Sequence, residues 1–458
     1  MNRSGEVLYR LEDDPGFLTC VLLGIQHVLA MFVSIVTVPY LVGKAVGMPD
    51  RVLAFFVSMG LVASGISTFI QVRRFGPVGS GLLSVQGTSF SFLQVFTAAV
   101  KTGGLPLALG TSLVTAPVEA LVSRFSFHAR RIFPPVVTGS VVLLIGLTLI
   151  RVGAANLAGG FGSADFGSAQ NLLLGLFVMA VILVLSVSRR PMVRSLAIII
   201  GILIGYSVAA FLGMINFSAF RGSFAGGFFT VPIPLRFGLR FGWDYVFPFA
   251  VIYLVTTVET IGDITATSEV SGEPVSGEVY ERRLAGGILA DSLNSMLAAI
   301  LNSPPNTTFS QNNGIIQLTG TASRRVGYHV AVLLVLLGLC PPVAAFVTTI
   351  PNCVIGGATV VLFGIIAAAG IRILLGTKLT HRDMLVIAGA LGTGLGVSFF
   401  PEIFDHLPDF ARNLFSSGIA TGGSVAILLN LVFPGGEFRG RKKRGEAEIS
   451  AESLQGEL

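Results

Sequence analysis

The amino-acid sequence predicts an all-α polytopic membrane protein with fourteen transmembrane spans. Of its 458 residues, 52% are apolar and 12% are charged, and the mean hydropathy is +0.81. Soluble domains carry roughly twice as much charge, and a spanning helix needs about 20 mostly apolar residues. The segments that predict spans are residues 17–43, 50–71, 78–98, 105–124, 132–152, 169–188, 193–215, 245–268, 283–302, 307–320, 327–348, 353–375, 382–400 and 410–434. The tenth of them is short and irregular.

The distribution of Lys and Arg supports this number of spans and predicts that both termini are cytoplasmic. Basic residues collect in short cytoplasmic connections. If the chain starts inside and crosses fourteen times, few of its 30 Lys and Arg residues face outward. These are Lys44, Arg51, Lys101, Arg151, Arg221, Arg236, Arg240 and Arg412. All the others lie inside, including a GRKKR run in the predicted cytoplasmic tail, residues 435–458. We therefore expect a multi-pass protein of the cell (inner or plasma) membrane.

Composition and motifs exclude several classes of protein. The formal net charge is +6 and the pI is near 9.5, but the basic residues stand at span ends, which favours topological anchoring at a lipid bilayer over nucleic-acid binding. Cys20, Cys340 and Cys353 form no CxxC pair, so neither a zinc site nor a disulfide framework is indicated. The sequence has no phosphate loop, GxSxG or HExxH motif. We expect no enzyme activity, no catalytic residues, no cofactor and no bound metal.

A polar, proline-broken segment interrupts the apolar pattern at residues 303–325. Pro304 and Pro305 remove two backbone N–H donors, and Phe309 is the one apolar residue between positions 306 and 313. Irregular polar backbone at membrane depth is tolerated only where protein or a water-filled cavity satisfies its hydrogen bonds. The tenth span therefore predicts a binding site.

Short internal matches indicate two halves of seven spans each. TSFS at residues 88–91 recurs as TTFS at residues 307–310, and the Pro-x4-Gly pattern at residues 134–139 recurs at residues 351–356. The two offsets, 219 and 217, nearly agree. Because seven is odd, the second half would enter the membrane upside down relative to the first. Inverted repeats of this kind place a site at their interface, between broken helices.

Ionisable residues inside predicted spans are further candidate functional groups. Glu259 and Asp263 stand four residues apart, so both carboxyl groups lie on one face of the eighth span. Asp291 lies in the ninth span and His27 in the first. A charge at the centre of a span costs about 2.5 to 3.5 kcal/mol on insertion scales. We expect Glu259 to bind and release a proton, because removal from water favours a neutral carboxyl. For the other three residues, a structural hydrogen-bonded clamp is an equally good interpretation.

Several motifs together resemble those of the nucleobase/ascorbate transporter family. The family signature is Gln, Glu or Pro, then Asn, any residue, Gly, four more residues, Thr, and Arg, Lys or Gly. Residues 311–320 (QNNGIIQLTG) fit every position. Residues 259–268 (ETIGDITATS), 26–32 (QHVLAMF) and 87–92 (GTSFSF) also resemble family segments. The resemblance covers nearly the whole chain and is closest to bacterial xanthine and urate permeases.

The resemblance implies a fold of fourteen spans in two inverted repeats, with short strands in the broken spans 3 and 10. A core domain would comprise residues 17–124 (spans 1 to 4) and 245–348 (spans 8 to 11). A gate domain would comprise residues 132–215 (spans 5 to 7) and 353–434 (spans 12 to 14), and would also form a homodimer. The core would move against the gate like an elevator. Half-helix N-termini beside the strands would hydrogen-bond a planar polar ring.

The resemblance also implies a set of site residues. Glu259 would accept hydrogen bonds from ring nitrogens, and Gln311 would pair with an amide-like edge of the substrate. Phe90 would stack on the ring or shape the pocket, and the backbone around Ser89, Phe90 and Ser310 would complete the site. Proton coupling or organisation of the site would involve Glu259, Asp263, Asp291, His27, Asn312 and Thr319.

The expected function is secondary active import of a purine nucleobase, xanthine or urate, by proton symport. The alternatives are a uracil or broad nucleobase permease and an anion transporter of the same fold. Carboxylates at Glu259 and Asp291 count against an anion site, which favours Arg, Lys or bare helix N-termini. Family members that resemble uracil carriers usually begin the signature with Glu. This chain has Gln311 there, whose amide offers donors as well as an acceptor, and this favours a purine.

Overall fold

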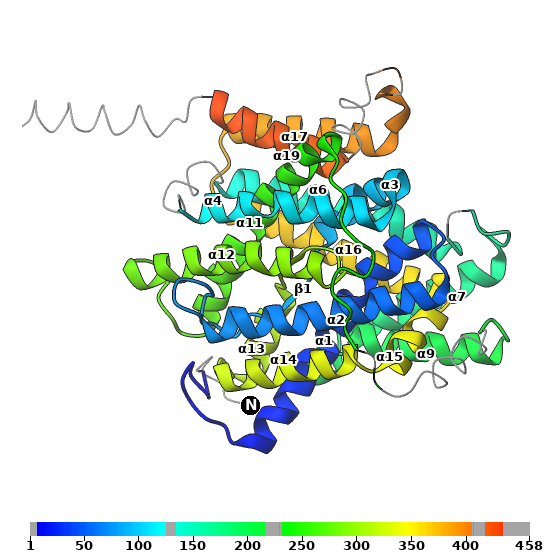
Figure 1. Ribbon diagram of the computed structural model, residues 1–458, viewed down its shortest axis with the longest axis horizontal. Helices are drawn as coiled ribbons and strands as arrows, with labels where there is room; N and C mark the ends of the chain where they lie inside the picture. Colours follow the sequence, from blue (N-terminus) through cyan, green and yellow to red (C-terminus); the bar gives the residue numbers. More distant parts are fainter. Residues whose placement is uncertain are drawn as a thin grey trace, which may run out of the picture.

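The chain folds into long helices that surround one short two-stranded sheet, and β1 lies near the middle of the molecule (Figure 1). The computed structural model describes residues 7–124, 134–160, 162–215, 229, 231–404, 406 and 417–433. Among these residues, seven helices are long and apolar enough to cross a membrane. The helical membrane fold is thus confirmed, whereas the count of fourteen spans stays a prediction. The predicted tail, residues 435–458, lies outside the described residues.

The first half of the chain shows where predicted spans are broken. Its elements are α1 (Phe17–Ala45), α2 (Asp50–Arg73), β1 (Gln86–Thr88), η1 (Phe90–Phe92), α3 (Leu93–Thr115), α4 (Pro117–Arg124), α6 (Pro135–Leu157), α7 (Ala169–Ser186), α8 (Pro191–Ser195) and α9 (Ala197–Phe211). Residues 78–98 are therefore not one helix, because a strand and a short 3₁₀ turn precede α3. Gly104, with φ of +74°, breaks α3 itself, since only glycine adopts such a conformation at low cost.

The second half repeats this order of elements. It contains α11 (Trp243–Val270), α12 (Glu278–Ile300), β2 (Asn306–Thr308), α13 (Gln311–Thr319), α14 (Arg324–Gly338), α15 (Pro341–Thr349), α16 (Asn352–Leu375), α17 (His381–Phe399), η2 (Pro401–Phe404) and α19 (Gly418–Val432). Predicted span 11 is divided into α14 and α15, which meet at 73°. Pro341 and Pro342 begin α15, and proline cannot continue a helix from the preceding turn.

Reciprocal packing shows that the two halves are inverted repeats. α2 of the first half packs on α14 of the second half, and its counterpart α12 of the second half packs on α4 of the first. In the same way, α3 packs on α11 of the second half, and α13 packs on α1 of the first half. Gly139 near the start of α6 faces Leu374 at the end of α16, and Gly356 near the start of α16 faces Leu157 at the end of α6. α6 and α16 are therefore antiparallel, as are the equivalent strands β1 and β2. The matches between the halves of the sequence thus reflect a structural repeat.

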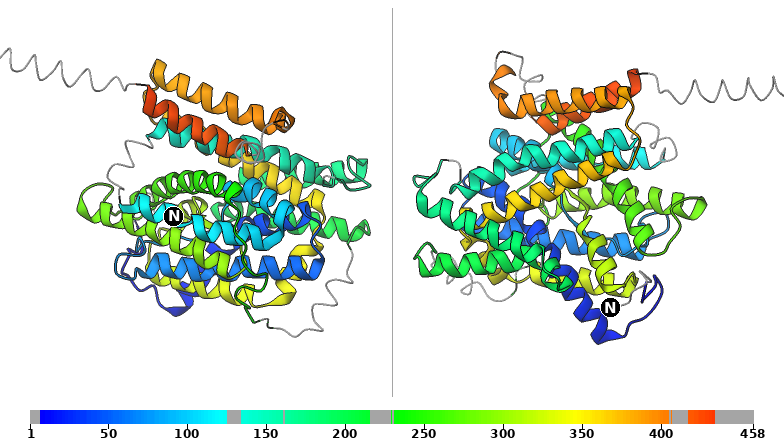
Figure 2. Two further views of the ribbon diagram at one scale, coloured as in Figure 1. Left: turned by 45° about the horizontal axis from the view of Figure 1, so that its top comes forward. Right: turned by 180° about the vertical axis from the view of Figure 1, so that it is seen from behind.

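The segments predicted as the gate pack largely on one another. α6 lies along α16, α16 contacts α7, and α7 contacts α9. α17 (orange) and α19 (red) lie side by side at one edge of the molecule (Figure 2). The movement of these helices against the rest, and the division into core and gate domains, remain predictions.

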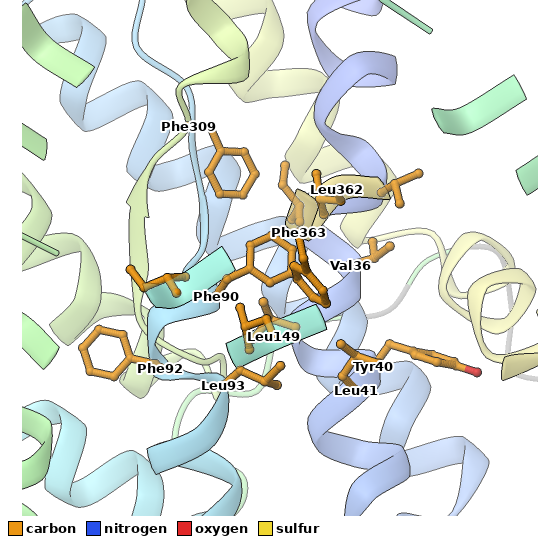
Figure 3. Close-up of a cluster of buried hydrophobic side chains, with 14 of the residues drawn as sticks. Val36, Tyr40, Leu41, Phe90, Phe92, Leu93, Leu149, Phe309, Leu362 and Phe363 are labelled. Carbon is orange, nitrogen blue, oxygen red and sulfur yellow. The ribbon is translucent and has the colours of Figure 1, made fainter. Parts of the chain in front are cut away.

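A large apolar cluster fixes the segment that follows β1 (Figure 3). Phe90 packs edge-to-face on Phe363 of α16, with ring centroids 5.4 Å apart. Phe92 packs against Tyr253 of α11 at 4.5 Å, and Leu149 of α6 is fully buried in the same cluster. Each buried side chain of this size contributes about 1.5 to 3 kcal/mol. The start of α3 is thus held by apolar contacts from both halves of the chain.

Close backbone packing of α6 on α16 predicts that Gly356→Ala destabilises the protein. A Cβ atom at Gly356 would lie 1.9 Å from the backbone nitrogen of Leu157, whereas one at Gly364 on the same helix would meet no atom within 4 Å. Overpacking costs about 1 to 3 kcal/mol. We expect a lower melting temperature for Gly356→Ala in detergent and no loss for the matched control Gly364→Ala. Equal melting temperatures would contradict the tight crossing.

Candidate functional site

Pairing of β1 with β2 brings two helix starts together. The strands are antiparallel, with Gly87 opposite Thr307. Beyond the strands, the Ser89 N–H donates to the Pro305 carbonyl at 2.9 Å, and the Phe309 N–H donates to the Val85 carbonyl at 3.1 Å. η1 begins at Phe90, directly after Ser89, and α13 begins at Gln311, two residues after Phe309. Since a helix N-terminus carries partial positive charge, both starts favour a negatively charged or hydrogen-bond-accepting group beside them.

The local sequence explains why the backbone is extended here. Proline removes an N–H donor and disfavours helical geometry in the residue before it, so Pro304 and Pro305 keep the chain out of a helix after α12. Gly87 lies against the ring of Phe309, and a Cβ atom there would approach that ring to 2.3 Å. A small residue in one strand and two prolines before the other thus allow the close strand pair.

Two carboxylates on α11 each bind the start of one broken helix. Glu259 accepts a hydrogen bond from the Ser91 hydroxyl in η1 at 2.7 Å. Asp263, one turn later, accepts from the Ser310 hydroxyl at 2.5 Å and from the Thr308 hydroxyl at 2.9 Å. Negative charge is favourable at helix N-termini. The i, i+4 spacing read from the sequence therefore places one carboxylate at each helix start.

One side of this junction is accessible. Ser310 is exposed, and Glu259 and Gln311 are half-buried. Cβ atoms built at Gly262 on α11 and Gly314 on α13 would meet no atom within 4 Å. Open space therefore lies beside the backbone of α11 at Gly262 and beside that of α13 at Gly314.

Another side of α13 is fixed by the buried amide of Asn312 and the half-buried amide of Asn313. Asn312 is 1% exposed, and its amide nitrogen donates to the Leu83 carbonyl. Its oxygen lies 3.0 Å from Nδ1 of His27, 285 residues away in the chain. Because this oxygen can only accept, Nδ1 of His27 carries the hydrogen. Asn313 in turn accepts from the Thr267 hydroxyl at 2.6 Å. These bonds hold α13 against α1 and α11.

The other predicted site residues lie farther from the accessible side. Asp291 is 1% exposed and accepts a hydrogen bond from Thr260 on α11. Thr319 closes α13, where its hydroxyl donates to the Ile315 carbonyl at 2.8 Å. The Ser89 N–H is engaged in strand pairing, and Phe90 is 7% exposed and packs on Phe363 (Figure 3). Whether Phe90 stacks on a substrate or shapes the pocket stays a prediction.

Sequence reasoning missed several polar residues of this region. Glu119 on α4 is 1% exposed and accepts a hydrogen bond from Thr256 at 2.6 Å. It stands inside the fourth predicted span, so the reasoning that selected Asp291 would have selected Glu119 as well. Ser91 and Thr308 bind the carboxylates of α11. The matching TSFS and TTFS segments were the available signal for these two hydroxyls.

A polytopic helical fold with a polar site between two broken helices defines a membrane transporter. The sequence matches the model of the Permease family over residues 18–403. It is 45% identical over 444 residues to xanthine permease XanP of Escherichia coli (strain K12), covering 94% of this chain and 96% of that protein. It is 43% identical over 449 residues to xanthine permease XanQ of the same strain, covering 95% and 96%. The chain therefore belongs to the Permease family, the nucleobase/ascorbate transporters.

More distant proteins agree in sequence or in fold. The nucleobase transporter PlUacP of Paenibacillus larvae is 36% identical over 434 residues, covering 94% of this chain and 98% of that protein. The transmembrane domain of the cyanobacterial bicarbonate transporter BicA superposes with a TM-score of 0.56 at 13% identity, covering 92% and 99%. The murine anion transporter Slc26a9 gives a TM-score of 0.60 at 13% identity, covering 92% and 69%. At such low identity, these two structures show a common fold alone.

The buried amide of Asn312 predicts a large effect of Asn312→Leu on stability. This change leaves the Leu83 carbonyl and Nδ1 of His27 without partners, and each buried unsatisfied group costs about 1 to 3 kcal/mol. We expect a clear drop in melting temperature in detergent. Thr319→Val at the end of the same helix removes two local bonds, to the Ile315 carbonyl at 2.8 Å and from the Thr321 N–H at 3.3 Å, and should lower the melting temperature less. Equal effects of the two variants would contradict the structural role of Asn312.

Proposed function

We propose that this chain is a secondary active transporter that imports an oxidised purine base, xanthine or urate, together with a proton. The observation that carries the proposal is the half-buried Glu259, bound to the start of one broken helix by Ser91. One turn later, Asp263 holds the start of the other broken helix, where Gln311 lies. Two relatives at 45% and 43% identity are named xanthine permeases, which favours the same class of substrate.

The chemistry of the accessible side suits a neutral polar ring. Glu259 can accept hydrogen bonds from ring N–H groups, while the amide of Gln311 can both donate to a carbonyl and accept from an N–H. An oxidised purine presents these groups side by side along its edge. A carboxylate at the same place would repel an inorganic anion, so the anion carriers of similar fold are a poor guide to the substrate.

Proton symport and its structural basis belong to the same proposal. A partly buried carboxyl such as Glu259 can take up a proton when substrate binds and lose it on the other side of the membrane. The core segments, residues 17–124 and 245–348, would carry the site past the gate segments, residues 132–215 and 353–434. The gate would also form a homodimer in the inner or plasma membrane, with both termini in the cytoplasm.

Glu259→Gln should abolish uptake of labelled xanthine while the protein remains in the membrane. The glutamine amide does not take up or release a proton near neutral pH. It also presents an N–H donor where the ring N–H groups of the substrate need an acceptor. The matched control is Glu269→Gln, an exposed position near the end of the same helix, which should transport like the parent. Uptake is measured in cells with and without a proton uncoupler, and membrane level by immunoblot. Parental uptake by Glu259→Gln, or uncoupler-resistant accumulation, would disprove proton symport through this residue.

Gln311→Glu should lower xanthine uptake about ten-fold or more at normal expression. The carboxylate offers acceptors only, and a mismatched buried polar pair costs about 1 to 3 kcal/mol. The conservative change Glu269→Asp, away from the site, serves as the control. Competition on the parent protein identifies the substrate class: unlabelled xanthine or urate should displace labelled xanthine, whereas uracil and sulfate should not. Displacement by uracil as strong as that by xanthine would rule out a purine-selective site.

A further inference from the structure

A pocket of about 420 Å³ lies between the end of α2, the start of α14 and the segment that precedes α1. α2 and α14 themselves lie side by side (Figure 1). The volume of the pocket is within the range of small-molecule sites, about 300 to 1,000 Å³. Its lining includes three arginines, Arg73, Arg324 and Arg325, and one carboxylate, Glu12. These residues are separate from those proposed to hold the nucleobase.

The segment that precedes α1 is fixed as one wall of this pocket. It runs parallel to the residues before α14, where Tyr9 pairs with Thr321. The Ala322 N–H donates to the Tyr9 carbonyl at 2.9 Å, and the Arg324 N–H donates to the Leu11 carbonyl at 3.0 Å. Leu11 is 4% exposed and packs in an apolar cluster with residues of α11 and α12. The pocket is therefore a built part of the fold.

The pocket carries an excess of positive charge. Nη1 of Arg324 pairs with the mostly exposed carboxylate of Glu12, while Nε of Arg324 donates to a backbone carbonyl, so this guanidinium is held in place. Arg325 pairs with Asp14 at 3.1 Å, but both side chains are more than half exposed, and such pairs are weak. Arg73 is exposed and forms no ion pair within the described part of the chain. One unpaired guanidinium thus stands beside two that are only partly neutralised.

Exposed aromatic rings lie at the edge of the pocket. Phe17, the first residue of α1, is 78% exposed and packs edge-to-face on the lining residue His329, with ring centroids 5.5 Å apart. Phe69, near the end of α2, is 39% exposed and contacts the lining residue Tyr328 at 5.6 Å. Both α1 and α2 are long and apolar enough to cross a membrane. Aromatic side chains at the ends of spans are typical of the membrane interface, so the charged pocket lies at the depth of the lipid headgroups.

We propose that this pocket binds the phosphate of an anionic phospholipid, whose acyl chains lie along Phe17 and Phe69. A phosphate diester offers negatively charged acceptor oxygens, which guanidinium groups bind through paired N–H donors. Phosphatidylcholine carries the same phosphate together with a cationic choline, which the arginines would repel. A free phosphate ion would suit the arginines but would leave the aromatic edge without a partner. Basic residues at the cytoplasmic ends of spans attract anionic lipids, and the three arginines lie on the predicted cytoplasmic side.

Photo-crosslinking of the whole chain in phosphatidylcholine nanodiscs tests the site without any transport measurement. The probe is a phosphatidylglycerol that carries a diazirine in its acyl chain. Mass spectrometry of the peptides should place the label at the start of α1 and the end of α2. Unlabelled phosphatidylglycerol should compete for this labelling, whereas inorganic phosphate should not. Equal labelling by the matching phosphatidylcholine probe, or labelling only elsewhere, would overturn the proposal. Competition by inorganic phosphate would assign the pocket to a soluble anion and would equally overturn it.

Removal of one arginine is the second arm of the test. Arg73→Gln should lower labelling of these two segments about five-fold, because each basic residue near a membrane surface contributes about that factor to the binding of anionic lipid. Since Arg73 is exposed and has no ion pair to lose, the melting temperature should stay unchanged. The matched control is Arg189→Gln, an exposed arginine between α7 and α8 on the same predicted side, which should label like the parent. Parental labelling in both Arg73→Gln and Arg73→Gln/Arg325→Gln, or an equal loss in Arg189→Gln, would refute the site.

Discussion

The antiparallel pairing of β1 with β2 is the constraint on which the rest of the structure depends. It sets the starts of η1 and α13 beside each other, and α11 then fixes both starts through Glu259 and Asp263. A shift of the strand register by one residue would turn the hydroxyl of Thr308 away from Asp263, because neighbouring strand residues face opposite sides. The carboxylate of Asp263 would then lie in a membrane protein without one of its donors, at considerable cost. Strand register and carboxylate placement therefore stabilise each other.

Apolar packing around the junction offsets the free-energy cost of burying its polar groups. Phe90 and Phe92 of the first half pack on α16 and α11 of the second half. Close contact of α6 with α16 needs glycines at positions such as Gly356. The junction is open on the side of Gly262 and Gly314 but sealed toward His27 and Asn312. The proposed substrate, a flat, neutral ring with donors and acceptors on its edge, would meet the junction from the open side. A fold shared with anion carriers does not imply a shared substrate.

The sequence predicted the elements that depend on local pattern and failed where partners are distant in the chain. Pro304 and Pro305 revealed the broken tenth span, and the spacing of Glu259 and Asp263 predicted that both carboxylates face the same way. The offset between the halves correctly indicated an inverted repeat. The bond between His27 and Asn312 could not be derived, because nothing local specifies a partner 285 residues away. Glu119 was overlooked in an otherwise apolar span, and the burial of Phe90 against Phe363 depends on a helix from the other half.

Hydrogen–deuterium exchange of the protein in lipid, with and without xanthine, tests the central claim most directly. If a purine ring is held where two broken helices start, residues 89–93 and 310–313 should be protected together when xanthine is present. Sulfate at the same concentration should leave both segments unchanged. Protection of both segments by xanthine alone is the predicted result. Protection of only one segment, of neither, or of both by sulfate as well would contradict a site built from the paired helix starts.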